Sequence, residues 1–442
     1  MAYNPKAQYV IHTGKMENVL PTLEGKFHAV LCDPPYGIAF MGKEWDTVQG
    51  PSAFQSRVKA WGEALMPLLY PGALVLMFGG TRMWHRLAAG MEDAGFEMWD
   101  TLMWLHGQGF PKAQDISKLI DKANGDERGA VIGQRQDILQ KQAADLRNGH
   151  RKIKDSFDVG APERNNGFVK ISADITAAGS IQSAPWSGHK TCALKPAWEP
   201  VLCFRAPSQG KTYAELAQMF GSGALYVDGG RIVTDGGDGN GLGSLFGGLG
   251  NTFLFLHGED RTDTMGRYPA NLALDEESAE LLDEQSGDKM HGDGSVTENF
   301  CETGEASWFP KRGGGAVNGM RFGDTGGASR FFYCAKSSSA ERHSGIANNH
   351  PTVKPVDLCT WLATLLLPPS SVQNRRLLVP FSGSGSEMIG ALGAGWDEVV
   401  GVESDAAYCD IARARIKHHN GLQSADGTAV IHKVDDRQPE LF

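Results

Sequence analysis

The sequence lacks the features that would place it in a membrane or outside the cell. It has no apolar run long enough to span a bilayer, and its first residues lack the basic-then-apolar pattern of a secretory signal. Its seven cysteines stand singly without a C-x-x-C pair, which gives no sign of a disulfide framework. His189 and Cys192 would make only half of a zinc site. We therefore expect a soluble, cytoplasmic protein without a membrane segment or a bound metal.

The length and the charge bound the organisation of the chain. A chain of 442 residues exceeds one ordinary core, so we expect two or three domains, or one domain with a large insertion. The net charge of −10 is unfavourable for a nucleic-acid partner. The stretch 128–154, however, holds seven Lys or Arg against two Asp. This local excess of positive charge fits a solvated connection or a phosphate-contacting segment, and charge alone does not separate the two.

The first 105 or so residues predict alternating strands and helices. Residues 27–32 form a short apolar run typical of a buried parallel strand, and this run ends at Asp33. The segments that follow are a helix at 54–69, a strand at 73–78, a helix face formed by Met83, Leu87 and Met91 with Gly95 at its end, and a strand at 96–105. This order of elements predicts an α/β fold.

Regular periodicity fades between about residues 106 and 329, where glycines cluster, and it returns after Phe331. The later segments are a helix at 356–367, a strand at 377–379, a helix from Glu387, a strand at 399–402 and a helix at 406–417 that Asp405 is placed to cap. We therefore expect an irregular domain inserted into an α/β domain.

A glycine loop, Phe381-Ser382-Gly383-Ser384-Gly385, follows a predicted strand and opens a predicted helix. Glu403 ends the next strand about 20 residues later, which is the spacing of a nucleotide-binding βαβ unit with a ribose-binding acid. A dinucleotide fingerprint would have a third glycine where Met388 stands, and no P-loop lysine follows. The loop therefore favours S-adenosylmethionine, which has no pyrophosphate, over NAD or ATP.

The tetrapeptide Asp33-Pro34-Pro35-Tyr36 stands at the end of a predicted strand, where open α/β sheets place their sites. The prolines fix φ and remove two N–H donors, so Asp33 and the Pro34 carbonyl can accept both protons of an exocyclic amine. Tyr36 can stack on the base, which is worth about 1–3 kcal/mol. The nitrogen lone pair could then attack a sulfonium methyl group in line. Alone, the tetrapeptide also fits a plain turn or an exposed P-P-x-Y ligand.

The order of the two motifs resembles the β-type DNA amino-methyltransferases, in which D-P-P-Y precedes a target-recognition region and the F-x-G-x-G loop comes last. Further segments similar to that family or to its phage and prophage members are 350–355, 401–405 with Tyr408 and Ala412, 267–271 and 329–334. The resemblance implies a Rossmann-like S-adenosylmethionine-dependent methyltransferase fold with a mostly parallel seven-stranded sheet. It also implies double-stranded DNA as substrate, base flipping and a homodimer.

The family's functional residues carry over onto the matching positions of this chain. The residues implied for catalysis are Asp33, Pro34, Pro35 and Tyr36. The residues implied for the cofactor are Cys32, Asp33, Thr352, Lys354, Phe381, Ser382, Gly383, Ser384, Gly385, Glu403 and Ser404, with Thr352 and Lys354 near its methionine end. The family usually carries Gly-Asp near its start, where this chain has Gly14-Lys15. The aspartate contact to the adenine of the cofactor is therefore missing or made by another residue.

We expect the catalytic half at 1–120, the target-recognition region at 121–329, the cofactor-binding half at 330–420 and a tail at 421–442. Only the middle region is large and irregular enough to hold a duplex around a flipped base. The basic residues predicted to contact phosphates are Arg128, Arg135, Lys141, Arg151, Lys152 and Lys154.

Several rival functions remain to be weighed. N6 of adenine is the favoured target, and N4 of cytosine is the alternative, because N4 enzymes more often carry Ser at the position of Asp33. C5-cytosine methylation needs a cysteine after proline, which the sequence lacks, so the tripeptide Glu17-Asn18-Val19 is treated as a coincidence. Other hypotheses are an RNA or protein methyltransferase, a Rossmann oxidoreductase and a non-catalytic DNA-binding protein on the same scaffold. The large insertion, Met388 and the intact Asp33 argue against these three in turn.

Overall fold

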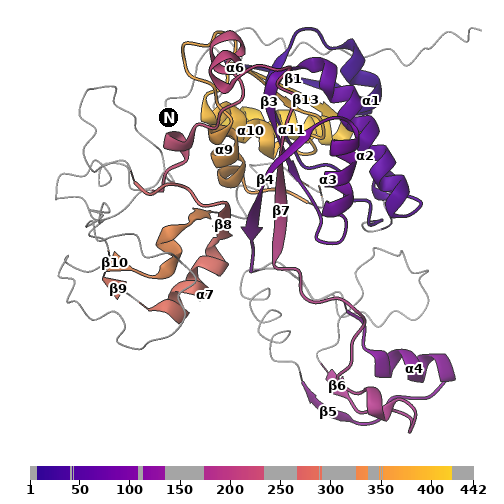
Figure 1. Cartoon of the computed structure of the whole chain (residues 1–442). Helices are drawn as coiled ribbons and strands as arrows, with labels where there is room; N and C mark the ends of the chain where they lie inside the picture. Colours follow the sequence, from indigo (N-terminus) through magenta and orange to yellow (C-terminus); the bar gives the residue numbers. More distant parts are fainter. Residues whose placement is uncertain are drawn as a thin grey trace, which may run out of the picture. The chain divides into compact units, whose positions relative to one another are not determined.

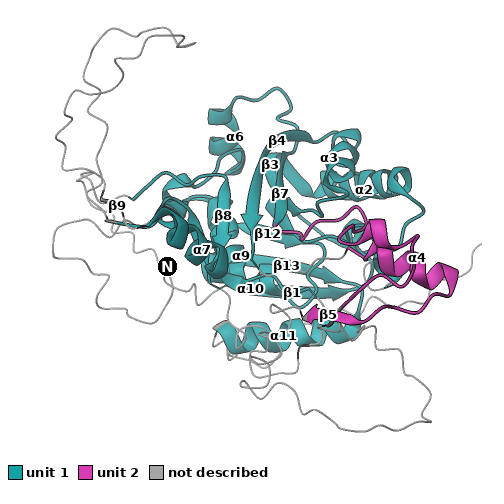
Figure 2. Cartoon of the chain, turned by 90° about the horizontal axis from the view of Figure 1, so that it is seen from below, with its two compact units in different colours: residues 1–107, 198–442 teal, residues 108–197 magenta. Residues whose placement is uncertain are grey.

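The computed structural model describes residues 7–39, 42, 44–107, 113–134, 174–232, 266–287, 289–290, 325–336, 348, 350 and 352–420. The chain divides into two compact units (Figure 2). Unit 1 contains Met1–Gly107 and Trp198–Phe442, and unit 2 contains Gln108–Ala197. Among the helices of the described part, none combines the length and the apolar character needed to cross a membrane.

Unit 1 is built on a sheet whose described strands run in the order β1-β13-β12-β2-β3-β7-β4-β8-β11 (Figure 1). The strands are β1 (Gln8–Thr13), β2 (Phe27–Cys32), β3 (Leu69–Phe78), β4 (Glu97–Leu105), β7 (Trp198–Arg205), β8 (Leu272–Asp275), β11 (Tyr333–Ala335), β12 (Arg376–Val379) and β13 (Glu398–Glu403). Only β7 runs antiparallel to its neighbours among these strands. The predicted α/β fold with a mostly parallel sheet is thus confirmed.

The predicted number of seven strands is wrong, because the described sheet has nine. β8 and β11 extend it beyond β4, and each is too short to show a clear alternation of polar and apolar residues in the sequence. The boundaries also differ from those expected. Unit 2 ends at Ala197, whereas β7 and β8 lie inside the expected insertion of 121–329 and belong to the sheet of unit 1.

Helices cover both faces of this sheet (Figure 1). One face carries α9 (Val356–Leu365), α10 (Ser386–Ala394) and α11 (Ala406–Asn420), and the other carries α1 (Met16–Val19), α2 (Pro51–Leu65) and α3 (Trp84–Asp93). The helices predicted at 54–69, 356–367 and 406–417 therefore form, with ends shifted by a few residues. Asp405 caps α11 as predicted, because its Oδ1 accepts the Ala407 N–H at 2.8 Å.

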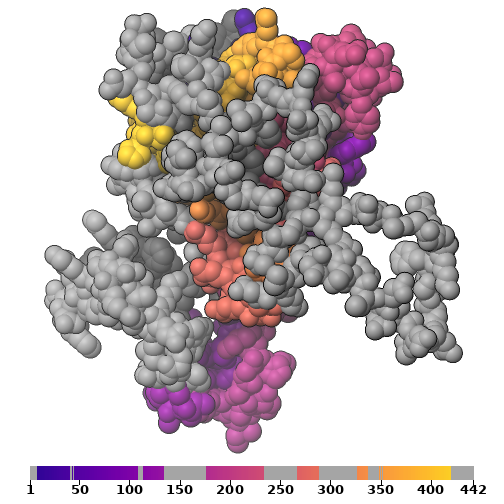
Figure 3. All heavy atoms as spheres, turned by 90° about the vertical axis from the view of Figure 1, so that its left-hand side faces the viewer, coloured from indigo at the N-terminus to yellow at the C-terminus, as the bar shows by residue number. Residues whose placement is uncertain are grey.

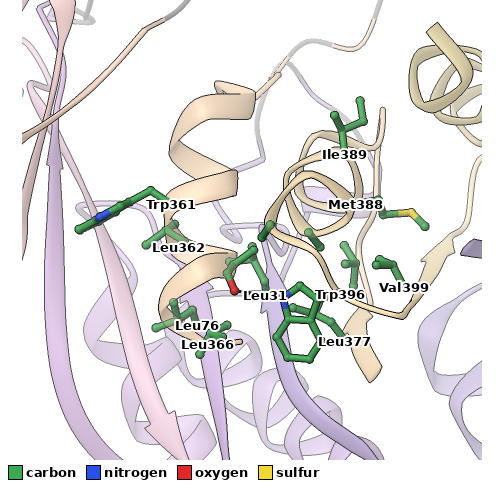
Figure 4. Packing of buried hydrophobic residues seen from close by; sticks show 14 of the residues in the cluster. Leu31, Leu76, Trp361, Leu362, Leu366, Leu377, Met388, Ile389, Trp396 and Val399 are labelled. Atoms are coloured by element: carbon green, nitrogen blue, oxygen red, sulfur yellow. Dashed lines mark hydrogen bonds between the residues drawn. The ribbon is translucent and has the colours of Figure 1, made fainter. Parts of the chain in front are cut away.

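The core under α9 and α10 holds the strand ends in place. Side chains of these helices and of the sheet belong to one buried cluster (Figure 4), which includes Trp361, Leu362, Met388, Ile389, Leu31, Leu76, Leu377 and Val399. Trp396 is fully buried beside them, and its indole N–H donates to the Ala363 carbonyl at 3.0 Å. Each large apolar side chain buried in this way stabilises the fold by about 1.5–3 kcal/mol. The sheet is consequently a rigid support for the loops at its edge.

Unit 2 contains α4 (Ile116–Asn124), β5 (Val131–Gln134), β6 (Asp174–Thr176) and η5 (Ala184–Trp186). β5 pairs antiparallel with β6, and the segments on either side of the stretch 135–173 lie together as purple and magenta spheres in Figure 3. The side chain of Asp121 in α4 is buried. Its carboxylate accepts the Gly179 N–H and the Ser180 hydroxyl, each at 2.9 Å.

Candidate active site

The carboxyl ends of β2, β12 and β13 meet at one edge of the sheet. β12 pairs in parallel with both β2 and β13, so Asp33, the glycine loop at 381–385 and Glu403 follow neighbouring strands. β7 runs in the opposite direction, and its start therefore lies at the same edge, where the Pro200 carbonyl accepts the Gly79 N–H at 2.9 Å. The topology thus gathers segments that are far apart in the chain, as the position of sites in open α/β sheets leads one to expect.

Four polar side chains, which we call the Asp33 cluster, meet at this edge: Asp33, Tyr36, Glu199 and Lys354. The Lys354 ammonium lies 2.9 Å from Asp33 Oδ2 and 2.9 Å from Glu199 Oε2. The Tyr36 hydroxyl is within donating distance of both carboxylates, 2.8 Å from Asp33 Oδ1 and 3.1 Å from Glu199 Oε2. It also accepts a hydrogen bond from Lys354 Nζ at 3.1 Å. One ammonium and one hydroxyl thus bridge two carboxylates.

The protonation states of the cluster follow from burial and mutual charge. Burial alone would lower the pKa of Lys354, but the Asp33 and Glu199 carboxylates raise it well above its ordinary value. Burial would raise the pKa of Glu199, and the nearby Lys354 reverses this and lowers it. Burial, followed by the Asp33 and Glu199 charges, raises the pKa of Tyr36 well above its ordinary value. At neutral pH Lys354 is therefore a cation, Glu199 an anion and Tyr36 a neutral hydroxyl.

The backbone around Tyr36 is fixed by contacts on both sides. Asp46 is buried, and its carboxylate accepts the Gly37 N–H at 2.7 Å and the Ile38 N–H at 3.1 Å. The Tyr36 ring packs so closely on Gly80 that a Cβ there would lie 2.8 Å from a ring carbon. The ring orientation is therefore set before any ligand binds.

The glycine loop is tied to Glu403 at the end of β13. Glu403 Oε2 accepts the Gly383 N–H at 2.9 Å, and Oε1 accepts the Asp405 N–H at 2.8 Å and the Ser404 hydroxyl at 3.2 Å. Gly385 has a φ of +86°, and a Cβ there would lie 3.0 Å from Ala412. The loop thus requires glycine at 385, and the Gly383 N–H holds it against the Glu403 carboxylate. Burial raises the pKa of that Glu403 carboxyl.

Further side chains hold the loop from behind. Arg415 of α11 is fully buried and donates from Nη1 to the Ser384 carbonyl at 2.7 Å, the Ser384 hydroxyl at 3.0 Å and the Ser386 hydroxyl at 3.2 Å. The Phe381 ring meets the Trp61 ring edge-on, with centroids 4.9 Å apart. The Ser382 hydroxyl is buried without a hydrogen-bond partner in the described part of the chain. A loop anchored in this way is already ordered for a ligand.

Three residues predicted to bind the cofactor are placed differently from the rest. Cys32 is fully buried in the core under α2, so its side chain packs inside the fold. Thr352 is exposed, and its carbonyl bonds to the ring of His350, which stacks edge-on against Tyr408. Lys354, expected near the methionine end of the cofactor, has its ammonium inside the Asp33 cluster.

Sequence reasoning missed Glu199, Asp46 and Arg415. A signal existed for Glu199, since a carboxylate stands next to the apolar run of β7, which reads WEPVLCFR. Pro200 in that run argues against a central strand, because proline lacks the N–H that a ladder needs. Asp46 and Arg415 act through contacts between segments distant in the chain, which their own sequence neighbourhoods do not reveal.

The Arg128 guanidinium makes several contacts inside unit 2. It forms an ion pair with the buried Asp121 and donates to the Ser117 hydroxyl at 2.8 Å, the Thr176 hydroxyl at 3.1 Å and the Thr176 carbonyl at 2.8 Å. These bonds use its Nε, Nη1 and Nη2 and give Arg128 an internal role in unit 2, and its predicted contact with a DNA phosphate stays a prediction. The other residues predicted to contact DNA lie outside the described residues, namely Arg135, Lys141, Arg151, Lys152 and Lys154.

Glu387 adds a buried carboxyl in the first turn of α10. Burial, and then the charge of Asp33, raise its pKa to about 7. Because folding raises the pKa of this carboxyl, the folded state favours its protonated form. The contribution to the free energy of unfolding is fully present below the pKa of the unfolded chain and is lost as the pH rises through about 7. We therefore expect Glu387→Gln to stabilise the protein at pH 8 by about 1–3 kcal/mol and to change little at pH 5. Melting curves of both proteins at the two pH values test this, and an equal difference at both would contradict it.

Two sequence comparisons match part of this chain to DNA methyltransferases. Residues 27–127 match the N6_N4_Mtase family model, described as DNA methylase. The type II methyltransferase M.HindIII of Haemophilus influenzae is 23% identical over 131 residues, which cover 22% of this chain and 42% of the relative. The matched segment thus spans less than half of the relative's length. The family match includes β2 and the tetrapeptide after it, and it supports a DNA methyltransferase of the N6 or N4 type without distinguishing the two groups.

Two solved structures align with most of this chain at low sequence identity and low TM-score. The M1.HpyAVI–SAM complex is 11% identical, with 92% of this chain and 100% of that chain covered and a TM-score of 0.36. The PvuII DNA methyltransferase, described as cytosine-N4-specific, is 10% identical, with 95% of each chain covered and a TM-score of 0.42.

Proposed function

We propose that the chain is a site-specific DNA methyltransferase of the β type, which transfers the methyl group of S-adenosylmethionine to N6 of adenine in duplex DNA. The observation that carries this proposal is the meeting of two motifs at the ends of the adjacent strands β2 and β12. The tetrapeptide at 33–36 follows the first strand and the glycine loop at 381–385 follows the second. The match with DNA methylases covers the first motif and supports the class of reaction.

The residues at the glycine loop fit a nucleoside cofactor that carries a sulfonium. Glu403 Oε1 accepts from Ser404 and Asp405, whereas Oε2 accepts only from Gly383 and keeps one lone pair, so it can accept a ribose hydroxyl. Gly383 and Gly385 let the backbone approach the ligand closely. When bound, S-adenosylmethionine supplies an electrophilic methyl group on its sulfur.

The Asp33 cluster fits the target amine. Asp33 spends one lone pair of each carboxylate oxygen on Tyr36 or Lys354 and keeps others for the amine, while the Pro34 carbonyl is the second acceptor. The fixed Tyr36 ring offers a surface on which the base can stack. Because the amine of adenine is hidden in a duplex, the base must be flipped out, at a cost of a few kcal/mol.

The choice of adenine depends on Asp33, because N4-cytosine enzymes more often carry Ser at that position. N4 of cytosine remains the alternative acceptor, and both amines present the same two protons to the cluster. Incubation with unmethylated DNA and cofactor labelled in the methyl group, followed by digestion to nucleosides, separates the two. Label in N6-methyladenine is the expected result, and label in N4-methylcytosine would select the alternative.

DNA binding supplies a separate prediction. We propose that the basic stretch at 135–154 contacts DNA phosphates and that 121–329 contributes target recognition. Charge reversal of Arg151, Lys152 and Lys154 should weaken duplex binding and reduce the dependence of log Kd on log salt concentration. With fewer phosphate contacts, the protein displaces fewer counterions from the DNA when it binds. Binding by fluorescence anisotropy at several salt concentrations measures both quantities. Unchanged affinity and slope would contradict the proposed DNA contact.

We also propose that the protein is a homodimer, which a measurement of its mass in solution tests.

A further inference from the structure

Glu199 is the member of the Asp33 cluster to which neither the sequence motifs nor the family match assigns a role. We propose that Glu199 is a positioning residue for methyl transfer: it holds Lys354 and Tyr36 from the side opposite Asp33 and gives the cluster its net negative charge. The inference rests on the proposed function and names a residue that the reaction needs beyond the tetrapeptide.

The geometry gives Glu199 two partners, and both of them also contact Asp33. Its Oε2 receives Lys354 Nζ at 2.9 Å and the Tyr36 hydroxyl at 3.1 Å. Lys354 and Tyr36 lie 2.9 Å and 2.8 Å from the two carboxylate oxygens of Asp33. Without Glu199, the ammonium and the hydroxyl would both be drawn to Asp33 alone, and they would compete with the incoming amine for its oxygens.

The net charge of the Asp33 cluster gives a second reason to assign Glu199 a role in methyl transfer. Two carboxylates and one ammonium give the cluster a net charge of −1, whereas Asp33 and Lys354 alone would be neutral. The lone pair of the amine nitrogen would form the N–C bond as the C–S bond breaks, and the sulfonium would leave as a neutral thioether. The nitrogen would carry positive charge until one of its two protons is lost, and Asp33 can accept that proton. A fixed negative charge beside that nitrogen stabilises the transition state more than the ground state, and it does so strongly where water is excluded. Lys354, with 6% of its side chain exposed, shows that the cluster is largely shielded from water.

The fold explains how this carboxylate reaches the site. β7 is the antiparallel strand of the sheet, so its first residues lie beside the end of β3. Glu199 follows Trp198 at the start of β7 and keeps 25% of its side chain exposed. It therefore lies at the border between the buried ion pair and the side from which a base can enter.

The test compares Glu199→Gln with the wild type in single-turnover transfer to a duplex oligonucleotide at saturating S-adenosylmethionine and DNA. We expect the transfer rate to fall roughly 10–100-fold, the size of effect that misplacing a reacting group produces. The affinity for S-adenosylmethionine, measured by calorimetry, should stay unchanged, and Glu199→Asp should recover part of the rate. The matched control is Glu97→Gln, which removes an exposed carboxylate paired with Arg205 at the far end of the same strand pair.

A second comparison shows whether Glu199 acts through Lys354. If it does, Glu199→Gln should lower the rate much less in a Lys354→Met background than in the wild type, because the shared partner is already gone. The same loss in both backgrounds would show that Glu199 acts without holding Lys354, by its charge alone or by contact with the substrate, and would overturn the positioning role. A wild-type rate in Glu199→Gln, or a loss explained by lower cofactor affinity, would overturn it as well. Absence of transfer by the wild type would overturn the proposed function and the inference together.

Discussion

Asp33→Ala is expected to abolish methyl transfer and to leave the affinity for S-adenosylmethionine within a few-fold of the wild type. Asp33 is the only carboxylate that the tetrapeptide offers to the target amine, and the second acceptor in the proposed arrangement is the Pro34 backbone carbonyl. Removing an oriented hydrogen-bonding group from a transition state costs about 10²–10³ in rate when one donor or acceptor is lost. The loss should be larger here, because alanine also removes the negative charge beside the nitrogen that becomes positive.

The variant should still fold, because Lys354 keeps Glu199 as a counterion and Tyr36 keeps a hydrogen-bond acceptor on the same carboxylate. Cofactor affinity by calorimetry and transfer of labelled methyl groups to DNA are the two measurements. Retained transfer would remove Asp33 from the reaction. Loss of both cofactor binding and transfer would show that Asp33 belongs to the cofactor site more than to the base site.

Glu403→Gln is expected to weaken the binding of S-adenosylmethionine strongly. The substitution keeps the size of the side chain, but it removes the charge that strengthens bonds to ribose hydroxyls. It also leaves one amide oxygen where two carboxylate oxygens accept the Gly383 and Asp405 N–H groups. Hydrogen bonds to a charged group contribute about 1.5–3 kcal/mol, so the Kd for S-adenosylmethionine should rise by about one to two orders of magnitude. The matched control is Asp405→Asn, which keeps a cap for α11 and removes a neighbouring charge.

The same residue gives a pH dependence. Burial raises the pKa of Glu403, so the carboxylate takes up a proton at a higher pH than an exposed glutamate does. The wild-type affinity for S-adenosylmethionine should therefore weaken as the pH falls through that raised pKa, and the Glu403→Gln affinity should not change over the same range. Titration calorimetry at several pH values tests this. Parallel pH profiles for the two proteins would show that another group is responsible.

The strands that are buried on both faces of the sheet were predictable from the sequence. The strand predicted at 27–32 is β2 with the same bounds, since six consecutive apolar or shielded residues suit a central parallel strand. The strands predicted at 377–379 and 399–402 are β12 and β13, whose ends differ from the predicted ones by at most one residue. The strands β7, β8 and β11 were not predicted, because Pro200 interrupts the first and the other two are too short to show a period.

The sequence motifs of the candidate site were predictable, but the contacts between segments distant in the sequence were not. Asp33, the glycine loop and Glu403 stand at strand ends, so their meeting followed from a parallel sheet once the strands were placed. Glu199 comes from the antiparallel strand, and only the strand order brings it to Tyr36 and Lys354. Arg128 was predicted from local charge, which does not reveal a buried partner such as Asp121.

The most direct test of the account is the nucleoside composition of DNA treated with the purified wild type and, in parallel, with Asp33→Ala. Unmethylated duplex DNA is incubated with each protein and S-adenosylmethionine, digested, and quantified for methylated nucleosides by mass spectrometry. We predict N6-methyldeoxyadenosine with the wild type and none above background with the variant. Equal methylation by the two proteins, or no methylated base from a wild type that binds both DNA and S-adenosylmethionine, would contradict the account.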